Sequence, residues 1–281
     1  MEKLYQKNWF RKLLFLILTF AIVQVLISVN IINDYLQATL ATICINIILA
    51  VSLNLITGFT GQFSLGHAGF MSIGAYVCAI ITLRNPTIGS FVLGVFSGAV
   101  IAALVGFLVG LPTLRLRGDY LAIATLGMSE IIRIIFINMG EITNGPAGLS
   151  GIPRFVNWVW LFIFTAGIVL LISNFLKSSH GRACISIRED EIAADSIGIN
   201  TTKYKVVSFI IGAFCAGIAG ALYASYFYFI KPDLFGFMKS IDVLVIVVLG
   251  GLGSISGSIL AAILLALVST YFQSFPEIRM I

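Results

Sequence analysis

Residues that are suited to line a path through a membrane gather in one interrupted apolar stretch, Ser52 to Tyr76. Apolar runs at Leu40–Ile56 and Met71–Leu83 flank a centre rich in glycine and small polar side chains. Irregular backbone inside hydrocarbon is tolerated only where protein covers it or where it borders a wet cavity, because each unpaired amide there is costly. Broken helices of this kind commonly line translocation paths. We therefore expect the path to include Gly58, Gly61, Gln62, Ser64, His67 and Gly69.

A second interruption of the same kind lies near the end of the chain. A short apolar run, Ile241–Leu249, ends in glycines, and an apolar helix is predicted to resume over Ser254–Phe272. Paired interrupted segments in the two halves of a chain indicate a binding or permeation region. The predicted path therefore also includes Asp242, Gly250, Gly251 and Gly253. Two roles stay open here: His67 either hydrogen-bonds at a helix terminus or gates the path, and Asp242 either ends a helix or lines the path.

Two opposite charges, Glu130 and Arg133, lie inside the apolar run Asp119–Asn138. Their spacing places them on one helix face, where they can neutralise each other. A charged residue inside a membrane span is by default a candidate for a functional site. An intramembrane ion pair of structural use, or one near a subunit contact, and a substrate ligand are the alternatives.

The composition identifies the class of protein. Of 281 residues, 59% are hydrophobic and 10% are charged, and the mean hydropathy is +1.06. Soluble domains carry roughly 25% charged residues, so this chain lacks the polar surface that water requires. We expect an all-α integral membrane protein, a polytopic helical bundle of about 8–9 spans with interrupted helices, because each span takes roughly 20 residues. No long polar linker divides residues 1–281, which predicts a single transmembrane domain.

Missing motifs and wide cysteine spacing argue against several other classes of protein. The cysteines are too widely spaced for a CxxC metal site or a disulfide framework, at Cys44, Cys78, Cys184 and Cys215. The sequence has no HExxH or GxSxG, so we expect no enzyme, and no GxxxxGK[ST], so we expect no bound cofactor and no ATP held by a phosphate loop. The net charge of +5 lies largely in loops beside membrane lipid, so we expect no nucleic-acid partner.

The distribution of basic residues predicts the orientation. The longer predicted spans are Leu13–Ile32, Ala38–Ile56, Phe63–Leu83, Ile88–Leu111, Asp119–Asn138, Trp158–Leu176 and Val206–Ile230. With the N-terminus in the cytoplasm, the inner segments hold eleven Lys and Arg residues and the outer segments hold five. Cytoplasmic loops carry the excess of Lys and Arg, so a multi-pass protein with a cytoplasmic N-terminus is predicted.

The largest polar segment, residues 177–205, is then cytoplasmic. Within it, Arg188 to Gly198 is expected to form a short amphipathic helix, with Ile192, Ile197 and Ile199 toward a partner and the charges toward water. Both signs of charge are interleaved, which argues against simple binding to anionic lipid. An ordinary solvated loop is the alternative from this segment alone.

Three blocks of sequence carry a resemblance to one family. They read SLNLITGFTGQFSLGHAGFMSIGAY (52–76), GRACISIREDEIAADSIGINTTKYKVVSFIIGAFCAGIAGALYA (181–224) and LGGLGSISGS (249–258). Together they resemble the membrane permeases of bacterial ATP-binding-cassette (ABC) importers for branched-chain amino acids, of the type II importer fold. The chain looks like the larger of the two paralogous permeases in such importers.

The resemblance implies an ATPase-coupling loop, which would contain Arg188, Glu189, Asp190, Glu191, Ala193, Ala194 and Gly198. It also implies a second paralogous permease subunit, two cytoplasmic ATP-binding subunits and an extracytoplasmic solute-binding protein. The substrate would be leucine, isoleucine or valine, and the protein would be located in the bacterial cytoplasmic (inner) membrane. The family usually continues past the position of Arg279, so a last span is expected to be missing. The alternatives are an ABC permease for urea or short amides and an ion-coupled secondary transporter or channel.

Overall fold

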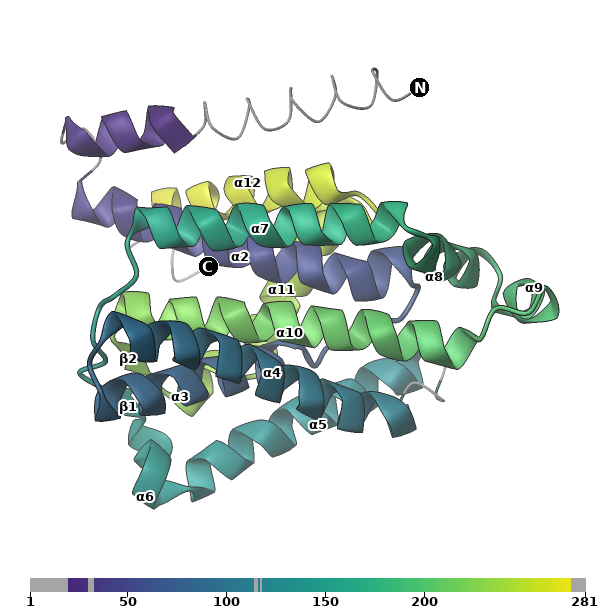
Figure 1. The fold of residues 1–281 in the computed structure, drawn as a ribbon, viewed down its shortest axis with the longest axis horizontal. Helices are drawn as coiled ribbons and strands as arrows, with labels where there is room; N and C mark the ends of the chain where they lie inside the picture. The colour runs from purple at the N-terminus through teal and green to yellow at the C-terminus, as the bar shows by residue number, and fades with distance from the viewer. Residues whose placement is uncertain (1–19, 30–32, 114–115, 117, 274–281) are drawn as a thin grey trace.

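A computed structural model describes residues 20–29, 33–113, 116 and 118–273. In this part of the chain the protein is a bundle of long helices that lie roughly along one common axis and run in both directions (Figure 1). Six segments are long and apolar enough to cross a membrane: Asp34–Phe59, His67–Arg84, Ile88–Thr113, Asp119–Asn138, Trp158–Lys177 and Thr201–Phe227. The all-α polytopic fold predicted from the composition is confirmed. The predicted first span, Leu13–Ile32, falls mostly outside the described residues, of which 20–28 are helical.

The long helices follow the predicted spans closely. They are α2 (Asp34–Asn54), α3 (His67–Arg84), α4 (Ile88–Thr113), α5 (Asp119–Asn138), α7 (Trp158–Lys177) and α10 (Thr201–Phe227). Two further apolar helices, α11 (Phe237–Gly250) and α12 (Ile255–Gln273), form the interrupted pair near the C-terminal end of the described chain. At 14 residues, α11 is short for a bilayer of about 30 Å, because each residue adds about 1.5 Å.

Short elements mark the two ends of the bundle (Figure 1). One end carries α6 (Gly140–Thr143) and the 3₁₀ turns η2 (Gly145–Ala147) and η3 (Pro232–Phe235). The strands β1 (Leu149–Ser150) and β2 (Phe229–Ile230) pair there antiparallel, with Leu149 opposite Ile230. The opposite end carries α8 (Ser179–Glu189) and α9 (Glu191–Ser196), which project beyond the other helices.

Glycine and alanine allow the central helices α3, α4 and α10 to touch through their backbones. A Cβ atom at Gly74 of α3 would overlap the carbonyl oxygen of Gly217 in α10. A Cβ atom at Gly98 of α4 would lie 3.0 Å from the carbonyl oxygen of Gly74, and one at Gly220 would overlap that of Met71. Small residues at fourfold spacing permit such close approach in membrane helices. The three helices therefore form one tightly packed unit.

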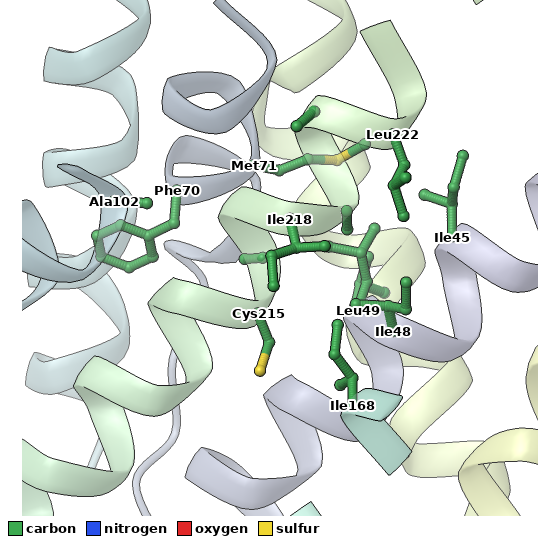
Figure 2. Close-up of a cluster of buried hydrophobic side chains, with 14 of the residues drawn as sticks. Ile45, Ile48, Leu49, Phe70, Met71, Ala102, Ile168, Cys215, Ile218 and Leu222 are labelled. Atoms are coloured by element: carbon green, nitrogen blue, oxygen red, sulfur yellow. The ribbon is translucent and has the colours of Figure 1, made fainter. Parts of the chain in front are cut away.

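A second group of helices, α2, α7, α11 and α12, packs beside this unit. Apolar side chains fill the space between the groups, and Figure 2 shows Ile45, Ile48 and Leu49 of α2 facing Cys215, Ile218 and Leu222 of α10. Helix α2 is the link, since it contacts α7, α10, α11 and α12. The core is thus continuous from one group to the other.

Large apolar side chains remain exposed on the outside of the bundle. On α4, for example, Leu93, Leu104 and Leu108 are 68%, 57% and 66% exposed. Contiguous apolar surface of this kind is rare on soluble monomers and marks contact with a membrane or with another protein. The outer faces of these helices are therefore suited to hydrocarbon.

Candidate functional site

The first predicted helix break is present. Helix α2 ends at Asn54 and continues as one turn of π-helix, η1 (Leu55–Phe59), and regular structure resumes only at His67. The connecting backbone turns at Gly61, whose φ is +74°. A Cβ atom at that position would also lie 3.3 Å from the Cα of Arg188. Gly61 is therefore required both for the turn and for the close approach of α8.

The second predicted break lies directly beside the first. Helix α11 ends at Gly250, and Gly251 and Gly253 adopt φ values of +89° and +82° before α12 begins. These conformations favour glycine because other residues clash there. A Cβ atom at Gly250 would approach Gly257 at 2.6 Å, which lets the two halves of this interrupted pair pack closely.

One buried side chain, Asn54, ties the two breaks together. Its Nδ2 donates to the carbonyl oxygen of Ser254 at 3.0 Å and to Ser258 Oγ at 2.8 Å. Its Oδ1 accepts from the backbone N–H of Gly253 at 2.9 Å. Asn54 is not among the residues that the sequence pattern predicts for the path. The available signal was a lone amide side chain in an apolar run directly before a glycine break.

Other polar groups of the first break face the interior of the bundle. His67 Nε2 lies 2.8 Å from Ser52 Oγ, so the first residue of α3 bonds to α2. Gln62 Nε2 donates to Ser208 Oγ of α10 at 3.5 Å. Two buried atoms of these residues, His67 Nδ1 and Gln62 Oε1, have no partner among the described residues. Buried polar atoms normally have a partner, so this region has unused capacity for water or a polar solute.

Three other predicted path residues serve local packing. Ser64 Oγ accepts from the N–H of Gly66 at 3.4 Å. A Cβ atom at Gly69 would lie 2.9 Å from Ser129 of α5, and one at Gly58 would meet Gly253 N as well as the Asn54 side chain. Gly58 and Gly69 bring backbone segments together and have no side chain to offer to a solute.

Arg188, in the last turn of α8, reaches both breaks. Its Nη1 donates to the carbonyl oxygen of Gly58 at 3.0 Å. The same atom lies so near the second break that a Cβ atom at Gly253 would be 2.6 Å from it. Its Nε donates to Glu189 at 3.0 Å, and its Nη2 forms an ion pair with the same carboxylate. One guanidinium group therefore joins the segment predicted to couple to an ATPase with the region predicted to form the path.

The single helix predicted over Arg188–Gly198 is wrong, because the structure divides this stretch at Asp190. That residue has an extended backbone, and its carboxylate accepts from the N–H groups of Ile192 and Ala193 at 2.9 and 3.1 Å. It therefore acts as the N-cap of α9, a position that aspartate favours. Two short helices, α8 and α9, replace the predicted one.

The end of α9 explains the small residues of the predicted coupling loop. The N–H of Ile199 bonds to the carbonyl of Ala194, and the N–H of Gly198 bonds to that of Asp195. This pairing is the Schellman motif, in which the residue after the helix adopts a left-handed conformation. Gly198 has φ +86° and faces open space, and Ala194 is buried. Gly198 thus serves the backbone and Ala194 serves packing.

Glu191 fixes α9 to the start of α10. Its Oε1 lies 2.7 Å from Nζ of Lys205, a lysine whose side chain is only 11% exposed. By contrast, Ile192 and Ile197 of the same unit are 71% and 76% exposed, and the neighbouring Ala193 is also exposed. These apolar side chains lie beyond the apolar spans. An apolar surface at the tip of a polar unit is suited to contact another protein.

The predicted ion pair is present and has a third member. Arg133 Nε lies 2.7 Å from Glu130 Oε2, and Arg133 Nη1 lies 3.2 Å from Asp233 Oδ1 of η3. The cluster therefore joins the end of α5 to a connector. This geometry favours the structural alternative over a substrate ligand.

Asp242 lies away from the glycine break, on the exposed side of α11. It lines a cavity of about 440 Å³ between α2, α11 and α12.

Within the described ranges, no group of three or more His, Cys, Asp or Glu side chains is arranged to hold a metal ion. All four cysteines are buried and unpaired. Burial raises the pKa of the Cys184 thiol in α8 above its ordinary value, and a hydrogen bond with Thr60 opposes this shift.

Comparisons with known proteins agree with this architecture. Residues 35–281 match the family described as branched-chain amino acid transport system, permease component. The chain is 40% identical over 271 residues to the high-affinity branched-chain amino acid transport system permease protein LivM of Salmonella typhimurium, and 39% identical to that of Escherichia coli. Each alignment covers 84% of this chain and 63% of the relative, so the chain spans less than two thirds of their length.

A more distant relative is the permease protein LivH of Escherichia coli, which is 27% identical over 257 residues and covers 81% of this chain and 82% of the relative. No solved structure matches. The greater identity to LivM agrees with the predicted likeness to the larger paralogue. The chain belongs to the family of branched-chain amino acid transport system permease components, as its three sequence blocks predicted.

Proposed function

We propose that this chain is a membrane subunit of an ATP-driven importer for leucine, isoleucine and valine. It forms part of the translocation path together with a second, paralogous permease. Two separate ATP-binding subunits dock on α8 and α9 in the cytoplasm, and an external solute-binding protein delivers the amino acid. The relatives, which are named as permeases of high-affinity branched-chain amino acid transport systems, support this assignment.

The position of Arg188 is the observation that carries the proposal. Docking to an ATPase requires an accessible apolar surface, and Ile192 and Ile197 offer one at the tip of α9. Coupling requires that movement of this tip reach the path. The hydrogen bond from Arg188 to Gly58 gives a direct contact between the α8–α9 unit and the first break.

Asn54 extends this contact to the second break. Because Asn54 bonds to Gly253 and Ser254, a displacement at Gly58 is transmitted to the start of α12. Closure of the ATPase pair would then move both breaks in the same step. Irregular backbone at the break has fewer helical bonds to lose than a continuous helix, so this is where a bundle can change its arrangement most readily.

The solute path is proposed to pass the polar groups of the first break. His67 and Gln62 each retain one buried atom without a partner in the described chain. A moving polar solute needs hydrogen-bonding groups that are not already fully used. His67 would then have both of its alternative roles: at the start of α3, one ring nitrogen hydrogen-bonds to Ser52, and the other remains available to the solute.

We further propose a location in the bacterial cytoplasmic membrane with the N-terminus inside. The excess of Lys and Arg in the segments that this orientation places inside supports it. The α8–α9 unit then faces the cytoplasm, and the end of the bundle with β1 and β2 faces the binding protein.

The deciding experiment is uptake by the assembled complex in lipid vesicles. The complex contains this chain, its paralogous permease and the two ATPase subunits, and binding protein loaded with radiolabelled leucine is supplied outside. Uptake is expected to require internal ATP and to persist when ionophores collapse the ion gradients. Uptake that follows an ion gradient without ATP would overturn the proposal. Uptake of urea or a short amide in place of leucine would overturn the substrate assignment.

A further inference from the structure

The cavity beside Asp242 lies at the end of the bundle opposite to α8 and α9. The N-terminal half of α2, the first turns of α11 and the C-terminal half of α12 line it, it is open on one side, and its volume is about 440 Å³. Small-molecule sites commonly occupy about 300–1,000 Å³. In the proposed orientation the cavity faces the side from which an importer receives its substrate.

Opposite charges lie together on one side of this cavity. Lys239 and Asp242 are three residues apart on α11 and both contribute to the lining. Lys239 Nζ also donates to Asn46 Oδ1 of α2 at 3.3 Å. Charged side chains at membrane depth are costly and usually mark functional positions. The pair has no net charge and offers one cation and one anion to a ligand.

Apolar side chains form the other part of the lining. Val245 and Ile246 continue along α11, and Leu265 faces them from α12. Such a surface suits a branched aliphatic group. A cavity with a cation, an anion and an aliphatic region therefore has the chemical features of a zwitterion that carries an apolar side chain.

We propose that this cavity is an amino-acid subsite of the permease itself, in which Lys239 binds the α-carboxylate and Asp242 binds the α-ammonium group. Val245, Ile246 and Leu265 contact the aliphatic side chain. The inference rests on the proposed function, and it adds a site in the membrane subunit separate from the first helix break.

The location of the subsite connects it to the second break. Asp242 lies eight residues before Gly250, which is about 12 Å along α11 at about 1.5 Å per residue. A ligand held at Asp242 therefore contacts the helix that leads into the second break, where Gly253 lies beside Arg188. This helix offers a short route by which an occupied cavity influences the α8–α9 unit.

A cysteine at the rim gives the first test. Ser269→Cys places a thiol in the lining, whereas the four native cysteines are buried. The assembled complex in lipid nanodiscs, without binding protein, is labelled with a membrane-impermeant thiol reagent. Leucine at about ten times its Kd is expected to slow labelling about tenfold, because about one complex in eleven stays unoccupied. Leucinol, which lacks the carboxylate, is expected to protect less.

Charge variants test the assigned contacts. In the Ser269→Cys background, Lys239→Gln is expected to weaken protection by leucine about tenfold or more and to reduce the difference between leucine and leucinol. Lys231→Gln, on the same side of the bundle but outside the cavity lining, is the matched control. Equal protection by leucine in Lys239→Gln and in the control would overturn the assignment of Lys239.

A space-filling variant separates this inference from the proposed function. Val245→Trp fills the cavity, while Val248→Trp adds the same ring on the same helix outside the lining. ATP-dependent leucine uptake is expected to fall only in Val245→Trp. If the wild-type complex takes up leucine and Val245→Trp does so equally well, with no protection of Cys at position 269, the subsite is refuted and the importer stands. If the wild type shows no ATP-dependent uptake, the proposed function fails, and protection still decides whether the cavity binds leucine.

Discussion

Replacement of Arg188 by alanine is the perturbation that bears most directly on coupling. It removes the hydrogen bond from Nη1 to the carbonyl of Gly58. A hydrogen bond to a charged group contributes about 1.5–3 kcal/mol. The Arg188 side chain is 35% exposed, and solvent screening reduces this to about 1–2 kcal/mol. The ion pair with Glu189 is mostly exposed and adds little.

The expected consequence is loss of transport without loss of ATP hydrolysis. A contact of about 1–2 kcal/mol corresponds to a factor of about 5–30 in the fraction of complexes whose α8–α9 unit is joined to the first break. The number of leucine molecules imported per ATP hydrolysed should fall by about that factor. Both quantities are measured on the same vesicles containing the complete complex.

A neighbouring arginine provides the control. Arg182 lies on the same helix, but it donates to the carbonyl oxygen of Lys177 at the end of α7 and to Ser179 Oγ at the start of α8, and within the described chain it has no hydrogen bond to either break. Arg182→Ala should keep the wild-type ratio of transport to hydrolysis. Arg188→Lys should give an intermediate ratio, because a lysine supplies one cationic head in place of the planar fork. If Arg188→Ala imports as much leucine per ATP as Arg182→Ala, the proposed coupling contact is refuted.

Three further outcomes are expected. Gly253→Ala should lower the melting temperature of the complex more than Gly251→Ala. Both positions have positive φ, but only a Cβ atom at Gly253 lies 2.6 Å from Arg188 Nη1, so the guanidinium must shift away from its hydrogen bond to Gly58; equal losses would contradict this packing. Glu191→Lys should deprive the buried Lys205 of its partner, at a cost of about 1–3 kcal/mol. The ATPase subunits should then separate from the permease on gel filtration, and retention of a stable complex would argue against the Glu191–Lys205 anchor. Ser196→Cys should react with an impermeant maleimide only in inside-out vesicles, and labelling from the outer side would contradict the proposed orientation. Cys184 should stay unreactive at pH 8, because its raised pKa keeps the thiol protonated.

The helices of this protein were predictable because hydropathy dominates the sequence of a membrane bundle. The apolar run Asp119–Asn138 coincides with α5, and the run from Ile88 ends within two residues of the end of α4. In hydrocarbon, backbone amides must bond within their own segment. A long apolar run therefore has few alternatives to a helix, and glycine clusters identify where the helix stops.

The site was predictable in part. Glycine patterns indicated both breaks, but they did not indicate that Asn54 and Arg188 join them, since these contacts link residues 199 and 130 positions apart. The division of the coupling segment at Asp190 was missed for a local reason. The helical periodicity of REDEIAADSIG continues through Asp190, and only its carboxylate, which caps the next helix, reveals the boundary. Side-chain capping competes with helix continuation.

The backbone contacts among α3, α4 and α10 have a practical consequence for spectroscopy. Where α3 and α10 meet at Gly74 and Gly217, the two backbones touch with no side chain between them, so we expect the membrane-embedded parts of this trio to move as one unit. Paramagnetic labels attached to its outer surface would serve as fixed reference points. Distances from them to a label on α9 would then report the displacement of that tip relative to this unit during a transport cycle.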